Sequence, residues 1–184
     1  MGIVELLVGT MLALLVLAAL TATVATGARL LAVAGARGEV EDTAELALET
    51  FLFDARRAGW DPGAAGVAPL VVAAPDAVTF AADLDGDRVV DATSEEQTGW
   101  VCARAAQRVS RVVGRQSLPI ADGVPACGFR YFDATGAAIA VPAAGLDAPG
   151  RARVAAVALD VTLAATGLRG TTARTARVAL RRPP

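Results

Sequence analysis

The fold is decided by the first 29 residues of the chain, MGIVELLVGTMLALLVLAALTATVATGAR, which run from Met1 to Arg29. Between Leu6 and Ala28 this stretch carries no charged side chain and is rich in Leu, Ala and Val. A helix of about 20 apolar residues crosses the hydrocarbon core of a bilayer. The stretch is therefore long enough to span a membrane.

Beyond Arg29 the pattern becomes amphipathic and predicts that the same helix continues to about residue 58. Gly59 and the sequence Asp61-Pro62-Gly63 then end it, and no proline precedes Pro62. Apolar residues recur three and four apart, with Arg37 as the one long polar residue among them. This predicted stripe consists of Leu30, Val33, Arg37, Val40, Ala44, Leu48, Phe51, Ala55 and Ala58.

Residues 59–184 predict short strands separated by Pro, Gly and Asp. Val157, Leu159 and Val161 alternate with polar Asp160 and Thr162, which is typical of a half-buried strand. Other strands are predicted at 70–73, 78–82, 100–104, 127–132, 139–141 and 176–181. One long helix followed by strands indicates an α+β fold with an antiparallel sheet packed on the helix. We expect three parts: residues 1–28 as the transmembrane or filament-core half of the helix, 29–58 as its amphipathic half, and 59–184 as a β-rich domain.

The composition argues against several classes of function. All 17 basic residues are Arg, there are 19 acidic residues and no His, and the net charge is -2. Without His the chain lacks the commonest general base and the commonest zinc ligand, so an enzyme is not expected. A net charge of -2 gives no excess of positive charge with which to bind nucleic acid. A local basic stretch at Arg104, Arg108, Arg111 and Arg115 is more typical of a solvated face or hairpin than of a nucleic-acid site, with a partner interface as the alternative.

Cys102 and Cys127 both lie in predicted strands. In an oxidising compartment a disulfide between them would stabilise the fold by roughly 3 kcal/mol through closing this loop, and we favour this pairing. The alternative is two separate buried thiols.

Four aspartates, Asp83, Asp85, Asp87 and Asp91, form a D-x-D-G-D-x-x-x-D run. Carboxylates at alternating positions of a tight loop can converge on one calcium ion. Arg88 stands where a calcium loop has Gly, but nearby Glu95 and Glu96 offer further ligands. The alternative is an Asp-Gly hairpin turn with solvated acids. No cofactor is required, and calcium is the one candidate ligand.

Glu5 is the one charged residue among the first 28. A secretory signal peptide would begin with basic residues and have a shorter apolar core. A plain signal anchor gives no reason for a carboxylate at its head. In a third interpretation Glu5 is functional, because a carboxylate at membrane depth is costly unless it pairs with a cation such as an N-terminal amine. A charge that sits at the headgroup level remains the alternative.

The opening Met1-Gly2-Ile3-Val4-Glu5-Leu6-Leu7 resembles the mature N-terminus of type IV pilins, which has Glu at the fifth position before a long apolar helix. Later segments are similar, in order, to motifs of the PilW-like minor pilins, although Arg88 replaces a common Gly. These segments are Phe53–Trp60, Val78–Asp87, Phe129–Gly136 and Val178–Arg181.

The resemblance implies a type IV pilin fold and a structural role as a minor pilin in assembly initiation or the tip complex. It further implies that prepilin peptidase removes a leader, that Met1 is the processed and methylated residue, and that Glu5 pairs with a neighbour's N-terminal amine. An initiator Met is the alternative for Met1. The expected partners are other pilins, and the expected location is the inner membrane with a periplasmic domain, then the pilus surface. A type II secretion pseudopilin and a membrane-anchored calcium- or ligand-binding module that does not polymerise are the alternative functions.

Overall fold

The computed structural model describes residues 2–164 and 171–181, except the side chain of Glu5. The chain divides into two compact units, residues 1–39 and residues 40–184. Each unit is considered by itself below.

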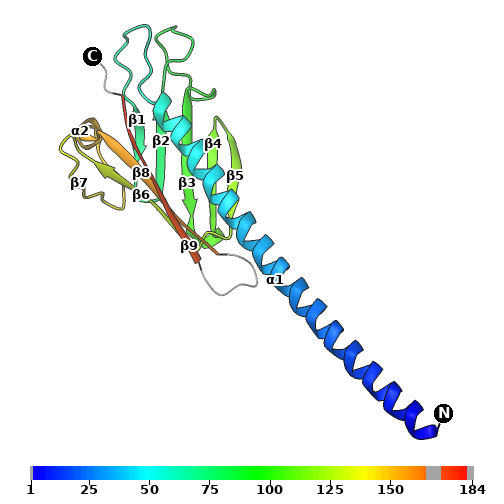
Figure 1. Ribbon diagram of the computed structural model, residues 1–184. Coiled ribbons are helices and arrows are strands. Elements are labelled where there is room, and N and C mark those ends of the chain that lie inside the picture. Colours follow the sequence, from blue (N-terminus) through cyan, green and yellow to red (C-terminus); the bar gives the residue numbers. More distant parts are fainter. Residues whose placement is uncertain (1, 165–170, 182–184) are drawn as a thin grey trace. The chain divides into compact units, whose positions relative to one another are not determined.

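A single helix, α1 (Ile3–Arg57), confirms the helix that the sequence predicts (Figure 1). It ends where the local signals place the end. Gly59 has φ 72°, a left-handed conformation that glycine adopts without strain. The amide of Gly59 donates to the carbonyl of Ala81 at 2.8 Å, so the chain leaves the helix directly onto a strand.

The rest of the second unit consists of two antiparallel sheets, with a short helix and a 3-10 turn between strands. The five-stranded sheet has the order β1-β2-β3-β4-β5: β1 (Leu70–Ala73), β2 (Ala77–Ala81), β3 (Gln97–Ala103), β4 (Arg108–Val113) and β5 (Gln116–Asp122). The four-stranded sheet has the order β7-β6-β8-β9: β6 (Ala126–Phe132), β7 (Ala138–Ile139), β8 (Ala156–Ala164) and β9 (Thr171–Ala179). The remaining elements are η1 (Arg104–Ala106) and α2 (Ala148–Arg153).

The α+β class is confirmed, but the sequence predicts one sheet on the helix and the structure has two. The break falls between β5 and β6, where Gly123 has φ 68° and Pro125 has no amide hydrogen to continue a ladder. The basic stretch at residues 104–115 includes η1, β4 and the turn into β5, so it belongs largely to a hairpin.

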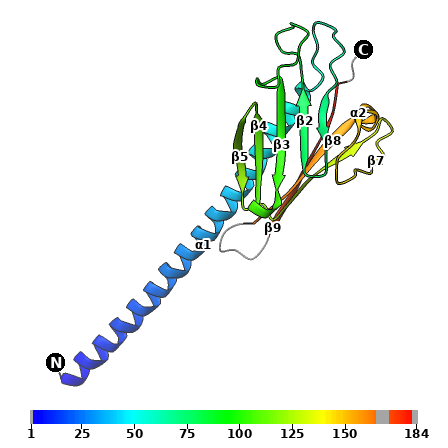
Figure 2. The same ribbon diagram turned by 180° about the vertical axis from the view of Figure 1, so that it is seen from behind.

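The core of the second unit lies between the C-terminal turns of α1 and both sheets. Phe51 of α1 is fully buried, and its ring centroid lies 5.7 Å from Phe80 in β2, 5.6 Å from Trp100 in β3 and 6.0 Å from Phe129 in β6. Seen from both sides, these turns of α1 run across the five-stranded sheet (Figure 2). One aromatic ring thus contacts strands of both sheets from the helix.

The predicted stripe on the helix is confirmed in its C-terminal part. Its buried members are Ala44, Phe51, Ala55 and Ala58, and its half-buried members that pack on the core include Val40 and Leu48. Leu30, by contrast, is 65% exposed. Burial of the helix therefore starts near the point where the second compact unit begins, about ten residues later than the pattern predicts.

Candidate functional site

The apolar half of α1 exposes its side chains. From Leu6 to Val24 every Leu, Val and Met is at least half exposed, from 53% for Val8 to 72% for Leu6. Soluble monomers rarely expose a continuous apolar patch of this extent. In the described part of the chain, α1 is also the helix that is long and apolar enough to cross a membrane. The apolar half of α1 is therefore a large exposed apolar surface, of the kind that marks an interaction with a membrane or with another protein.

The threonine hydroxyls in this half of the helix are satisfied inside it. The hydroxyls of Thr10, Thr21, Thr23 and Thr26 each donate at 2.9 Å to a backbone carbonyl three or four residues earlier. A hydroxyl bonded in this way needs no water, so it is tolerated in a lipid environment. This pattern fits a helix that works in an apolar medium.

The two residues for which the sequence predicts an assembly role are not both described. Met1 lies outside the described residues, and only the backbone of Glu5, within α1, is described. The pairing of Glu5 with an N-terminal amine therefore stays a prediction.

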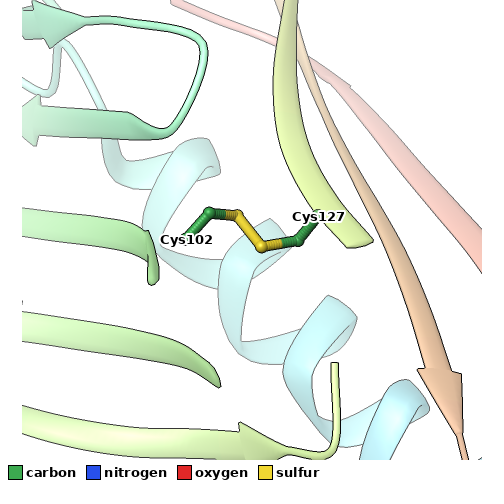
Figure 3. The surroundings of a disulfide bond; sticks show 2 residues. All are labelled: Cys102 and Cys127. Carbon is green, nitrogen blue, oxygen red and sulfur yellow. A yellow bond between two sulfur atoms is a disulfide. The ribbon is translucent and has the colours of Figure 1, made fainter. Parts of the chain in front are cut away.

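Cys102 in β3 and Cys127 in β6 are joined in a disulfide, the pairing that the sequence favours (Figure 3). Their Cα atoms are 5.8 Å apart, within the ordinary range for a bridge. The bond connects the two sheets, and both cysteines are buried in the core that includes Phe51. It thus cross-links the two sheets covalently beside the aromatic contacts of Phe51.

A buried ion pair that the sequence did not point to fixes the helix to the five-stranded sheet. Asp54 of α1 is 3% exposed. Its carboxylate accepts two hydrogen bonds from Arg111 in β4, at 2.7 Å from Nε and 2.9 Å from Nη2, and one of 2.9 Å from Nε1 of Trp100 in β3. The hydrogen bond to Asp54 raises the pKa of the Arg111 guanidinium, which thus stays charged.

The signal that could have revealed this pair is local: Asp54 interrupts an otherwise apolar helix face beside Ala55. Its partner Arg111, however, lies 57 positions away, within a basic stretch whose sequence pattern gives no sign of a buried partner. The structure also pairs Arg108 of that stretch with Asp122. Two of its four arginines therefore pair with carboxylates, Arg108 within the hairpin and Arg111 on α1, which favours a structural role over a nucleic-acid site.

The aspartate-rich segment between β2 and β3 folds into a loop held by its own carboxylates. Asp83 is fully buried and accepts hydrogen bonds from the amides of Gly86 at 2.7 Å and Arg88 at 3.1 Å. Glu96, which is also buried, accepts from Leu84 at 2.7 Å and Asp91 at 2.8 Å.

These bonds have a consequence for acid stability. Backbone hydrogen bonds, the one from Asp91 foremost, lower the pKa of Glu96, and the amide of Thr93 does the same for Asp91. Both groups stabilise the folded loop above their unfolded pKa of about 4, and this contribution is lost as the pH falls through the folded values.

Of the four predicted calcium ligands, the structure brings two together. One oxygen each of Asp83, Asp85 and Glu96 lie within 4.8 Å of one another. Asp87 and Asp91 instead direct their carboxylates at the amides of Val89 and Thr93, two residues further along. The third carboxylate of the cluster is therefore Glu96, not Asp87 or Asp91, which the alternating spacing predicts.

Because backbone amides already hold these carboxylates, we expect the protein to keep its sheets in chelator at ambient temperature. On heating in chelator it should then unfold in one cooperative transition. A thermal melt followed by circular dichroism, in chelator and in millimolar calcium, measures this. A calcium-dependent rise in melting temperature that Glu96→Gln removes would assign the ion to this cluster. No shift would exclude the cluster as a calcium site, and loss of the sheets in chelator would contradict the expectation.

Comparison with known proteins adds no assignment: the chain matches no protein-family model, and no curated protein matches it.

Proposed function

We propose that the chain is a minor pilin, a structural subunit that is held in the inner membrane by its N-terminal helix and then extracted into a type IV pilus. The observation that carries the proposal is the exposed stretch of α1 from Leu6 to Ala28, which has no charged side chain and whose threonine hydroxyls are satisfied internally. The same helix continues into a segment anchored by Phe51 and Asp54 in a disulfide-linked sheet domain. Such a chain combines an apolar assembly element with a folded polar domain.

The apolar helix would exchange lipid for neighbouring helices during assembly. Lipid tails and Leu or Val side chains are about equally apolar, so this exchange carries no large hydrophobic penalty. Packing and polar pairing then decide which neighbour is chosen. Glu5 would supply that pairing by neutralising the N-terminal amine of an adjacent subunit and so setting the axial register.

The Cys102–Cys127 disulfide supports a location of the sheet domain outside the cytoplasm, because disulfides persist in oxidising compartments. Prepilin peptidase would be the processing partner, and other pilins the assembly partners. A pseudopilin of a type II secretion system would use the same helix in the same way, so it remains a second candidate within this class.

A membrane-anchored calcium- or ligand-binding module that does not polymerise is a candidate of another class. The observation that favours it is the gathering of Asp83, Asp85 and Glu96. Such a module would use the helix only as an anchor and would have no need of Glu5.

Mass spectrometry of the intact N-terminus separates the two classes. For a pilin we expect Met1 to be the first residue of the membrane-extracted protein and to carry an N-methyl group. An unprocessed leader, or cleavage near Ala28, would support the non-polymerising module instead.

A further inference from the structure

A pocket of about 230 Å³ lies in the second compact unit. Three segments form its walls: the stretch that leads into β1, the short helix α2 and the residues that follow β9. The lining residues are Gly66, Ala68, Pro69, Leu70, Ala148, Arg151, Ala152, Val154 and Arg181. An engineered cavity of about 150 Å³ holds a benzene molecule, so this pocket has room for an aromatic ring with a substituent.

The lining of the pocket combines apolar residues with positive charge and has no acidic side chain. Seven of the nine lining residues are small or apolar, and the two polar ones are the arginines Arg151 and Arg181. Among the described residues, no carboxylate oxygen lies within 4 Å of either guanidinium, whereas Arg57, Arg108, Arg111 and Arg130 have such partners. The pocket thus offers positive charge and an apolar interior, with no acid of its own among the lining.

The first wall is fixed by local hydrogen bonds. The carboxylate of Asp61 accepts from the amides of Gly66 at 2.7 Å and Val67 at 3.0 Å. The hydrogen bond from the backbone amide of Ala65 contributes most to lowering the pKa of Asp61, so this carboxylate is ionised at neutral pH. Leu70, the next part of the wall, is buried in the core.

The other two walls are fixed as well. The amide of Leu146, just before α2, donates to Ala73 in β1 at 2.8 Å, and Arg151 donates from Nη1 to the Leu146 carbonyl at 2.9 Å. The guanidinium of Arg181 lies 4.7 Å from the ring centre of Trp60. A Cβ on Gly59 would come within 3.1 Å of the Arg181 carbonyl, so the backbone of Arg181 is closely packed there.

We propose that this pocket binds a carboxylate that carries a short apolar body, with the apolar part among Ala68, Leu70 and Val154 and the carboxylate held by Arg151 and Arg181. Each guanidinium presents several N–H donors in a plane, the arrangement that matches a carboxylate. Because the walls are already fixed, little ordering accompanies binding. The ligand is either a free small acid or the C-terminal residue of a peptide, which share this chemistry.

The test uses the full chain in lipid nanodiscs and fluorine NMR of 4-fluorobenzoate, with empty nanodiscs as the blank. For a ligand of this size we expect a dissociation constant of about 1 mM. The neutral isostere 4-fluorobenzamide should bind at least tenfold more weakly, since it keeps the ring and loses the charge. N-Acetylphenylalanine, tested alongside, represents a peptide terminus, and the tighter of the two acids identifies the source.

Three variants locate the site. Arg151→Ala and Arg181→Ala should each weaken 4-fluorobenzoate at least tenfold, and Ala152→Phe should block it while both guanidiniums remain. Arg153→Ala is the matched control, because Arg153 lies in the same helix turn but does not line the pocket. A melting scan of each variant verifies that it is folded.

Three results would overturn the proposal. The first is the absence of binding up to 20 mM, and the second is equal affinity for the acid and the amide. The third is a loss on Arg153→Ala as large as that on Arg151→Ala or Arg181→Ala.

Discussion

Replacing Glu5 by Ala or Gln is expected to abolish incorporation of the chain into filaments while its sheet domain stays folded. In the proposed assembly the carboxylate is surrounded by apolar helices and faces the N-terminal amine of a neighbour. Removing one partner of a buried ion pair costs about 3–5 kcal/mol, because the other charge is left unpaired. Gln keeps the size and hydrogen-bonding capacity of Glu, so its failure would identify the charge as the essential property.

Incorporation is measured by the amount of the chain in sheared filaments relative to the amount in membranes. Glu45→Gln is the matched control, since it removes an exposed carboxylate from the same helix and should assemble normally. The thermal melt of each purified variant reports on the sheet domain. Normal incorporation of either Glu5 variant would contradict the proposed pairing of Glu5 with an N-terminal amine.

The second large effect is expected at the buried anchor. Asp54→Ala should destabilise the second compact unit by about 3–5 kcal/mol, because it leaves the Arg111 guanidinium and the Trp100 indole N–H without their acceptor. Asp54→Asn should cost less, about 1–3 kcal/mol, since the amide oxygen still accepts one hydrogen bond but no longer balances the charge. Both changes are measured by denaturant unfolding of the chain in detergent micelles.

The control for Asp54 is an exposed ion pair of the same hairpin. Asp122→Ala breaks the contact with Arg108, whose side chain is 45% exposed, and should cost no more than about 1 kcal/mol. If the proposed anchor is correct, replacing Asp54 and Arg111 together by apolar residues should cost less than the sum of the single changes. An Asp54→Ala variant as stable as Asp122→Ala would show that the ion pair does not hold the helix on the sheet.

Features set by neighbouring residues were predictable from the sequence. The end of α1 follows from Gly59 and Pro62, and β8 follows from the alternation of Val157, Leu159 and Val161. Each signal is complete within a few residues, so it needs no knowledge of the rest of the fold.

Features set by distant partners were not predictable in the same way. β4 was not predicted because Arg111 points its charge toward buried Asp54, which breaks the alternation expected of a strand. Alternate spacing predicts Asp87 and Asp91 as calcium ligands, whereas these two side chains turn back to their own backbone and Glu96, in the turn just before β3, completes the cluster. The pocket near α2 is lined by three segments that lie far apart in the sequence, between Gly66 and Arg181. No local sequence pattern predicts it.

The most direct test of the central claim, that the apolar half of α1 packs against helices of neighbouring subunits, is site-specific photocrosslinking. The probe p-benzoylphenylalanine replaces Leu14, which is 65% exposed, and, as a control, Val89, which is 63% exposed in the loop before β3. In cells that assemble filaments we predict that the Leu14 probe gives an adduct whose peptide is the N-terminal apolar helix of another subunit, and that Glu5→Gln removes it. The Val89 probe should not reach such a helix. Adducts from Leu14 to lipid alone, or a helix adduct unchanged by Glu5→Gln, would contradict the account.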